Sequence, residues 1–292
     1  MKYDFNVKRL ENKIQISIDD WLYPEENVIE FHKISGKPSA TGFTKALAIG
    51  SNVEGVNKDD VLLLSKVACD VALTPTAFYT LDGKRYFNIP AEQIIGTFSK
   101  GIINFSNLVL RKGYVLFERI NKTQNSIISI EEKSTMMGKV VRVSEVSPFT
   151  EGDIIIVRDN VSTPVKFGDK KYFAVEEKFV VGVAGGTLSI KDVKILNEYI
   201  LMKPYISPYV LNSTILETPD INYEDLDYSD INNRNLFKVY YVEEGIGINK
   251  GDILLLNRDF TNYFYYENEK YFVINDKKWI SGKIIERDTL CN

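Results

Sequence analysis

Short runs of alternating or continuous apolar residues, separated by turn residues, recur along the whole chain. Residues 10–18 read LENKIQISI, and their alternation places Ile14, Ile16 and Ile18 on one face of a strand. Residues 61–64 read VLLL, a continuous aliphatic run of the length typical of a buried strand. These patterns predict an all-β protein made of many short strands.

One segment occurs three times with small changes. GVNKDDVLLL at 55–64 is nearly repeated as GINKGDILLL at 247–256, and TEGDIIIV at 150–157 lies between them. Each copy has turn residues, an aspartate and four aliphatic residues, which is typical of a tight turn that leads into a buried strand. Repetition of this kind predicts tandem structural units.

Each copy is followed by two further segments in the same order. The first opens with Tyr-Phe after a charged pair, at 84–87, 170–173 and 269–272. The second is apolar and contains a glycine, which is Gly96, Gly182 or Gly282. The step from the aspartate to the tyrosine is 19 residues in the second and third copies and 26 in the first, which predicts a longer loop there.

A fourth segment precedes each copy and begins with a leucine, a polar turn and an apolar strand. The three leucines are Leu10, Leu110 and Leu196. Four segments in a fixed order predict three tandem units of ordinary domain size, at 1–100, 101–187 and 188–292. Short strands with a turn every 8–12 residues favour a small barrel or sandwich for each unit.

The order of segments resembles the GroES-type co-chaperonin fold. The middle unit resembles it best, with an opening strand at 110–117, GKVVRV at 138–143, GDIII at 152–156 and a closing KFVVG at 178–182. The resemblance implies three tandem GroES-like β-barrels. Family members normally carry one unit per chain, so three fused units depart from the family pattern.

The functional part of that family is an apolar tripeptide in a mobile loop that binds a chaperonin. The matching loop of the middle unit holds Ile127, Ile128 and Ile130, and that of the third unit holds Ile215 and Leu216. The resemblance implies that these residues bind a partner. The alternative is that they anchor their loops onto a barrel or a neighbouring molecule.

Aromatic residues supply further candidates for partner binding. Residues 217–230 are acidic, without Lys or Arg, and Tyr223 and Tyr228 lie among the acidic residues. This pattern favours an arm that docks on a protein partner. Tyr265 lies in the run YFYY at 263–266, one face of which is expected to be exposed as an interface anchor.

Composition removes several classes of function. The 292 residues carry 36 Lys and Arg against 40 Asp and Glu, so no basic excess favours nucleic acid or an anionic membrane. One histidine, His32, and two cysteines give no metal-site pattern, and we expect no metal and no cofactor. The acidic run lacks the order of a calcium loop. No apolar run is long enough for a membrane-spanning helix, and the first residues do not resemble a signal peptide.

Motifs for nucleotide chemistry are incomplete. VGVAGG at 181–186 lacks the following helix of a dinucleotide-binding turn, and Gly182 is explained by its equivalents in the other units. SGKPS at 35–39 lacks the spacing of a phosphate-binding loop. No nucleophile is spaced with His32 in a recognisable motif.

We therefore expect a non-enzymatic protein whose partners are other proteins. The leading hypothesis is a virion structural protein, an auxiliary or decoration protein of a bacteriophage capsid that binds the shell through its barrels and loops. Its location would be the virion or the host cytoplasm. The alternative is a fused co-chaperonin that caps a chaperonin, and an enzyme of unknown type comes third.

Overall fold

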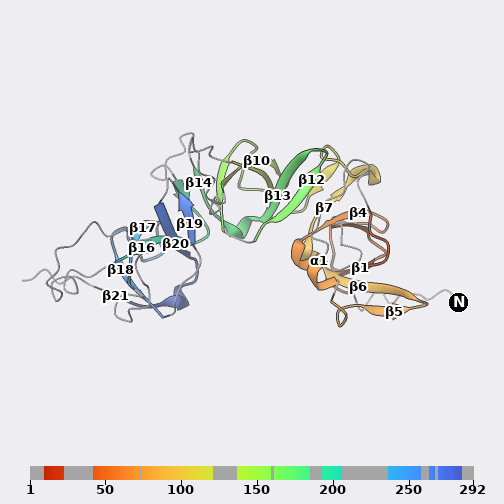
Figure 1. The fold of residues 1–292 in the computed structure, drawn as a ribbon, viewed down its shortest axis with the longest axis horizontal. Helices are drawn as coiled ribbons and strands as arrows, with labels where there is room; N and C mark the ends of the chain where they lie inside the picture. Colours follow the sequence, from red (N-terminus) through yellow and green to blue (C-terminus); the bar gives the residue numbers. More distant parts are fainter. Residues whose placement is uncertain are drawn as a thin grey trace, which may run out of the picture. The chain divides into compact units, whose positions relative to one another are not determined.

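The computed structural model describes residues 10–22, 42–72, 74–120, 137–158, 161–184, 193–205, 236–257, 263–266 and 269–284. Within these ranges, 21 strands accompany one α-helix, α1 (Lys66–Ala72), and antiparallel pairing joins neighbouring strands (Figure 1). The predicted all-β class is confirmed.

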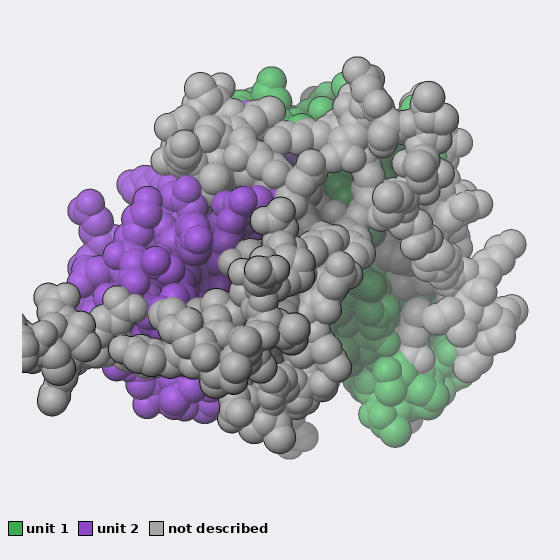
Figure 2. Space-filling model, turned by 60° about the vertical axis from the view of Figure 1, so that its left-hand side comes forward, with its two compact units in different colours: residues 1–120, 139–152, 161–177 green, residues 121–138, 153–160, 178–292 purple. Residues whose placement is uncertain are grey.

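The chain divides into two compact units, which Figure 2 colours separately. Unit 1 comprises residues 1–120, 139–152 and 161–177, and unit 2 comprises residues 121–138, 153–160 and 178–292. This division differs from the three predicted domains at 1–100, 101–187 and 188–292, which stay a prediction.

Unit 1 contains two four-stranded sheets and part of a third. The first sheet has the order β3-β1-β6-β5 and the second the order β2-β4-β7-β8, while β12-β13-β9-β10 are neighbours in the third. The bounds are β1 (Lys13–Ser17), β2 (Phe43–Lys45), β3 (Ala48–Ile49), β4 (Val61–Leu64), β5 (Tyr79–Leu81), β6 (Lys84–Pro90), β7 (Ile94–Phe98), β8 (Leu108–Leu110), β9 (Tyr114–Arg119), β10 (Met137–Val143), β12 (Thr163–Phe167) and β13 (Lys170–Glu176).

Unit 2 contains a six-stranded sheet of order β19-β20-β16-β17-β18-β21 and the neighbouring strands β11-β14-β15. The bounds are β11 (Ile154–Val157), β14 (Val180–Ala184), β15 (Val193–Ile195), β16 (Ile200–Pro204), β17 (Leu236–Val242), β18 (Ile253–Leu256), β19 (Tyr263–Tyr266), β20 (Glu269–Ile274) and β21 (Ile280–Ile284).

One backbone arrangement recurs three times along the chain. An opening strand (β1, β9 or β16) is followed by a Gly-Asp strand (β4, β11 or β18), a hairpin strand (β6, β13 or β20) and a closing strand (β7, β14 or β21). A short 3-10 helix precedes each closing strand, namely η2 (Ala91–Gln93), η4 (Glu177–Phe179) or η6 (Lys277–Trp279). We call these three sets of strands the first, second and third repeats.

The same irregularity marks each repeat. The register between the Gly-Asp strand and the closing strand shifts at Leu63/Leu64, at Ile156/Val157 and at Leu255/Leu256. In each repeat the residue just before the shift pairs with the closing-strand glycine, Gly96, Gly182 or Gly282. Such a bulge bends a strand locally, so its recurrence indicates the same strand geometry in all three repeats.

The turn before the Gly-Asp strand explains one departure from the sequence pattern. Gly152 and Gly251 have positive φ and donate their N–H to Val140 O and Val239 O, each at 2.8 Å. Asp59 has a φ of 69° and donates to Ala46 O at the same distance. Aspartate tolerates this left-handed conformation better than most residues, so the first repeat keeps the turn without glycine.

The opening turns show that one predicted equivalence is shifted by a residue. Lys13 N donates to Leu10 O and Tyr199 N to Leu196 O, whereas Tyr114 N donates to Arg111 O. Arg111 therefore takes the place of the two leucines. Leu110 lies one residue earlier, in a strand that pairs with Gly96. Equivalent positions in the three repeats are therefore aligned by this backbone turn and not by the leucine.

Linking strands join successive repeats within each unit. β8 pairs with the closing strand β7 and leads into β9, and β15 pairs with β14 and leads into β16. The sequence did not predict these strands. The longer loop of the first repeat was predicted, and the structure places helix α1 in it.

Candidate interaction surfaces

Successive repeats bury apolar faces against each other. In unit 1, Ile95 of the first repeat and Leu116 of the second belong to one buried cluster. In unit 2, Val181 of the second repeat and Leu201 of the third belong to another. All four side chains are fully buried. A closing-strand face of one repeat therefore packs with an opening-strand face of the next.

Among the described residues, the closing-strand face of the third repeat packs against no other repeat. We call it the tail surface and define it by Leu236, Leu255, Ser281 and Gly282. Leu255 is 40% exposed, whereas its equivalents Leu63 and Ile156 are 1% and 0% exposed. The tail surface therefore exposes apolar area that the other two repeats bury.

An ion pair borders the tail surface. Lys283 Nζ lies 2.6 Å from Asp252 Oδ2, and that oxygen also accepts the Asn249 N–H at 2.7 Å. Burial of the Asp252 carboxyl raises its pKa, but the hydrogen bonds and charge of Lys283 and the Asn249 N–H outweigh burial and lower it overall. Asp252 is thus held as a carboxylate that neutralises Lys283.

The opening-strand face of the first repeat is a second candidate, and we call it the head surface. It comprises Gln15, Tyr79, Tyr86 and Asn88 of β1, β5 and β6. Gln15 is 1% exposed and its amide donates a hydrogen bond to Tyr79 Oη, while the Tyr79 and Tyr86 rings stack 5.9 Å apart. Among the described residues, Gln15 Oε1 and Asn88 Oδ1 are buried without a hydrogen-bond partner.

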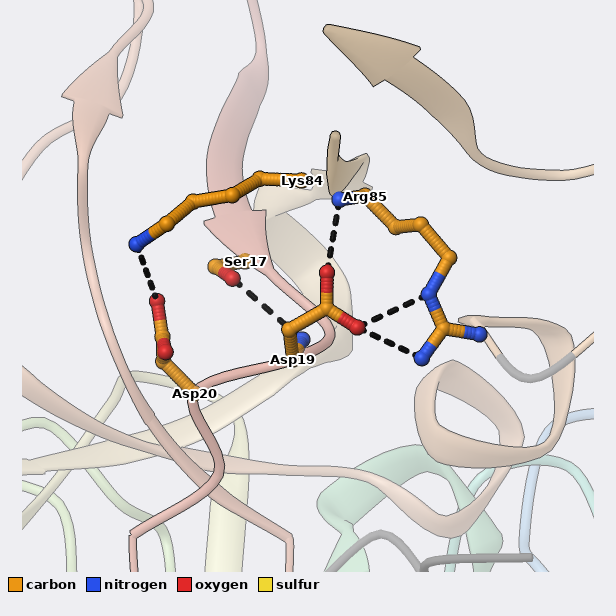
Figure 3. Close-up of polar contacts among 5 residues, drawn as sticks. All are labelled: Ser17, Asp19, Asp20, Lys84 and Arg85. Atoms are coloured by element: carbon orange, nitrogen blue, oxygen red, sulfur yellow. Dashed lines mark hydrogen bonds and ion pairs between the residues drawn. The ribbon is translucent and has the colours of Figure 1, made fainter. Parts of the chain in front are cut away.

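A charged cluster lies beside the head surface. Asp19 accepts the Arg85 backbone N–H at 2.7 Å and the Arg85 guanidinium at 2.8 and 2.5 Å, and Lys84 Nζ lies 3.6 Å from Asp20 (Figure 3). The Arg85 guanidinium lies 5.4 Å from the centre of the Phe78 ring. Burial raises the pKa of Asp19, but its hydrogen bonds to Arg85 and the nearby positive charges lower it overall.

Substituting Asp19→Asn is expected to lower the free energy of unfolding by about 0.5–1 kcal/mol at neutral pH, because solvent screens this partly exposed pair. The pKa of Asp19 is lowered in the folded state. The stability that its charge contributes is therefore fully present above the pKa of the unfolded chain, about 3.9, and is lost as the pH falls through the folded-state pKa. Urea unfolding at several pH values checks this. The difference between the two proteins must narrow towards low pH.

Asp20→Asn is the matched control for this prediction. Asp20 is more exposed and makes one long contact with Lys84, so its loss should change the free energy of unfolding by less than about 0.5 kcal/mol. A pH-independent difference for Asp19→Asn would contradict the assigned role of its charge.

Ion pairs between the opening strand and the hairpin differ between repeats. In the second repeat Glu118 lies 3.9 Å from Lys170, and in the third repeat Lys203 contacts Glu269. Each pair occupies equivalent positions, because Phe117 pairs with Phe173 as Met202 pairs with Phe272. The sign of each partner is therefore exchanged between the two repeats.

Lys203 is also packed against aromatic rings. Its Nζ lies 4.8 Å from the ring centres of both Tyr240 and Tyr271, and the Tyr271 hydroxyl donates to Glu269 at 2.9 Å. The hydrogen bond from Lys203 lowers the pKa of Glu269, and the Tyr271 hydroxyl adds to the effect. This cluster orders the hairpin of the third repeat against its opening strand.

Helix α1 carries a smaller exposed apolar patch. Val67 and Val71, one helical turn apart, are 60% and 42% exposed. The other face buries Cys69, whose thiol has its pKa raised to about 12, first by burial and then by the charge of Asp70. Lys66 N donates to Thr163 Oγ1 at 2.9 Å, which ties the start of the helix to β12.

The partner-binding residues that the sequence predicted lie almost entirely outside the described residues. This is true of Ile127, Ile128, Ile130, Ile215, Leu216, Tyr223 and Tyr228. Tyr265 lies in β19, where its backbone pairs with Lys270, and its side chain is outside the description. The structure therefore neither brings these residues together nor separates them.

Sequence reasoning missed the head and tail surfaces. The available signal was a change of residue type at equivalent positions. Ser281 replaces Ile95 and Val181, and Gln15 replaces Leu116 and Leu201. A comparison of the three repeats at each equivalent position would have identified both surfaces.

Within the described residues, no three His, Cys, Asp or Glu side chains are grouped so that they could hold a metal ion. No helix in the same residues is long and apolar enough to cross a membrane.

Comparison with known proteins adds no assignment, because no protein-family model and no curated protein matches the chain.

Proposed function

We propose that the chain is a non-enzymatic virion structural protein, an auxiliary or decoration protein of a bacteriophage capsid. The observation that carries this proposal is the packing of successive repeats within each unit, in which Ile95 joins Leu116 and Val181 joins Leu201 in buried clusters. Repeats that bury apolar faces against their neighbours give extended arrays suited to binding along a large surface.

The repeats would each correspond to a GroES-like β-barrel. The order of opening strand, Gly-Asp strand and closing strand supports this resemblance, as does the antiparallel pairing of the last two in each repeat. In this proposal the barrels form the scaffold, and the segments around Ile127–Ile130 and Ile215–Leu216 contact the shell.

Purified particles from the source material provide the test. We expect mass spectrometry to find the chain at a fixed ratio to the main shell protein, and cryo-electron microscopy to show its density on the shell. Absence of the chain from purified particles would contradict the proposal.

A pull-down with the host chaperonin tests the alternative of a fused co-chaperonin. The virion proposal expects no nucleotide-dependent binding. Nucleotide-dependent binding that Ile128→Asp abolishes would instead support the co-chaperonin. Ile18→Val, a conservative change in the core of the first repeat, is the control and should leave any binding unchanged.

A further inference from the structure

The outer edge of β21 pairs with no described strand. β21 is the last strand in the sheet β19-β20-β16-β17-β18-β21. Its equivalents β7 and β14 pair at the corresponding edge with the linking strands β8 and β15. An edge of this kind presents backbone N–H and C=O groups that can accept another strand.

Because Gly282 has no side chain, it leaves room at this edge for the close approach of another strand. A Cβ atom at Gly96 would lie 2.5 Å from Val109 O, and one at Gly182 would lie 2.7 Å from Lys194 O, because the linking strands approach that closely. A Cβ atom at Gly282 would meet nothing within 4 Å. Among the described residues, the third repeat thus has the glycine and the space but no linking strand.

The first residues of the chain match the linking strand β15 in part. The opening turns make Leu10 equivalent to Leu196, so residues 7–9 correspond to β15. Residues 7–9 read VKR and residues 193–195 read VKI, so Val and Lys are shared, and Leu10 matches Leu196 at the turn that follows. Arg9 stands at the position of Ile195, which is buried. We infer that residues 7–9 of one copy of the chain add to the β21 edge of a second copy, so that copies associate head to tail.

The head and tail surfaces both carry a polar residue where the contacts between repeats carry an apolar one. Between repeats, Ile95 shares a buried cluster with Leu116, and Val181 shares one with Leu201. At the chain's two ends the equivalent residues are both polar, Ser281 at the tail and Gln15 at the head. Association in the register of the internal repeats would place these polar residues at matching positions.

One pair of like charges at the added strand opposes this register, and a neighbouring aspartate offsets part of the repulsion. By equivalence with Lys194, which pairs with Val183, Lys8 of one copy would lie opposite Lys283 of the other. Like charges in this position are unfavourable. Asp252 lies 2.6 Å from Lys283 Nζ and compensates for part of this repulsion.

A head-to-tail contact uses two different surfaces of the same chain, so it extends into a ring or an open filament. Three strand residues and a partly polar face make a small interface, and we expect a dissociation constant on the order of 10–100 µM. This inference goes beyond the proposed function and does not depend on the identity of any shell.

Sedimentation velocity of the purified full chain tests the inference, over concentrations from about tenfold below to about tenfold above that dissociation constant. The parent chain should form dimers and longer oligomers. Gly282→Ala should raise the dissociation constant at least about tenfold, because its Cβ would occupy the position of the incoming backbone. Its thermal unfolding should match the parent, since nothing in the described part of the chain lies near that Cβ.

A second variant blocks the other partner strand. Lys8→Pro removes a backbone donor from the added strand and should weaken association to a similar extent, whereas Lys2→Pro, outside residues 7–9, should not. An equimolar mixture of Gly282→Ala and Lys8→Pro chains has one intact head and one intact tail. It should form dimers and no longer species.

Three results would overturn the inference. The parent chain remains monomeric over the whole concentration range, Gly282→Ala associates as strongly as the parent, or the mixture of blocked chains fails to form dimers. The first result would leave the β21 edge to a strand from a different protein.

Discussion

Gly182→Ala is expected to lower the free energy of unfolding of unit 2 by about 2–3 kcal/mol, the cost of forcing extra atoms into a packed region. The added Cβ would lie 2.7 Å from Lys194 O and 2.8 Å from Val193 Cγ1. The first of these is a backbone atom, so relief requires β15 to move away from β14 and to lose ladder pairing.

Urea unfolding followed by the fluorescence of Trp279, with Trp21 replaced by Phe in all proteins compared, measures the effect. Gly282→Ala is the matched control, because it changes the equivalent residue of the third repeat where there is open space. It should alter the free energy of unfolding by no more than about 0.5 kcal/mol. Equal losses in the two variants would show that the close approach of the linking strand is not the cause.

Phe43→Ala is expected to cost about 3–5 kcal/mol, as is usual for a buried phenylalanine. Phe43 is fully buried in the cluster shared by the first and second repeats. Its ring centre lies 5.6 Å from that of Phe98 in β7 and 6.4 Å from that of Phe167 in β12. The loss removes both aromatic contacts and leaves a cavity between the two repeats.

Trp21 fluorescence in a chain with Trp279→Phe reports this transition, because Trp21 is buried in the core of the first repeat. The urea midpoint should fall with little change in the slope of the transition. Val109→Ala, at an exposed position of β8, is the control and should cost less than about 0.5 kcal/mol. A loss for Phe43→Ala as small as that of the control would contradict the shared core.

The recurrence of strands was predictable because the turn and strand signals are local. The segments at 55–64 and 247–256 each form a turn and then a strand, as expected. Gly182 was assigned a structural role on the ground of its equivalents in the other repeats, and the close packing at Gly96 and Gly182 agrees with such a role. The physical reason, the close approach of β8 and β15, depends on a strand from the next repeat and was therefore invisible in any one segment.

The interaction surfaces were harder to predict than the strands. Leu255 has the same aliphatic character as Leu63 and Ile156 and differs from them only in exposure. Exposure depends on what packs against a face, which a repeated local pattern does not record. The loop residues Ile127, Ile128 and Ile215 were chosen from a family resemblance, and this choice stays a prediction.

The exchanged ion pairs have a consequence for folding. If the β19–β20 hairpin added to β9 in place of β12–β13, Glu269 would face Glu118, and the reverse exchange would bring Lys170 against Lys203. Like charges at diagonal positions of neighbouring strands lie within reach of each other and repel. Tandem repeats of similar sequence are prone to exchange equivalent strands during synthesis and folding. The reversed polarity favours the correct hairpin for each module and so guards this chain against internal strand swapping.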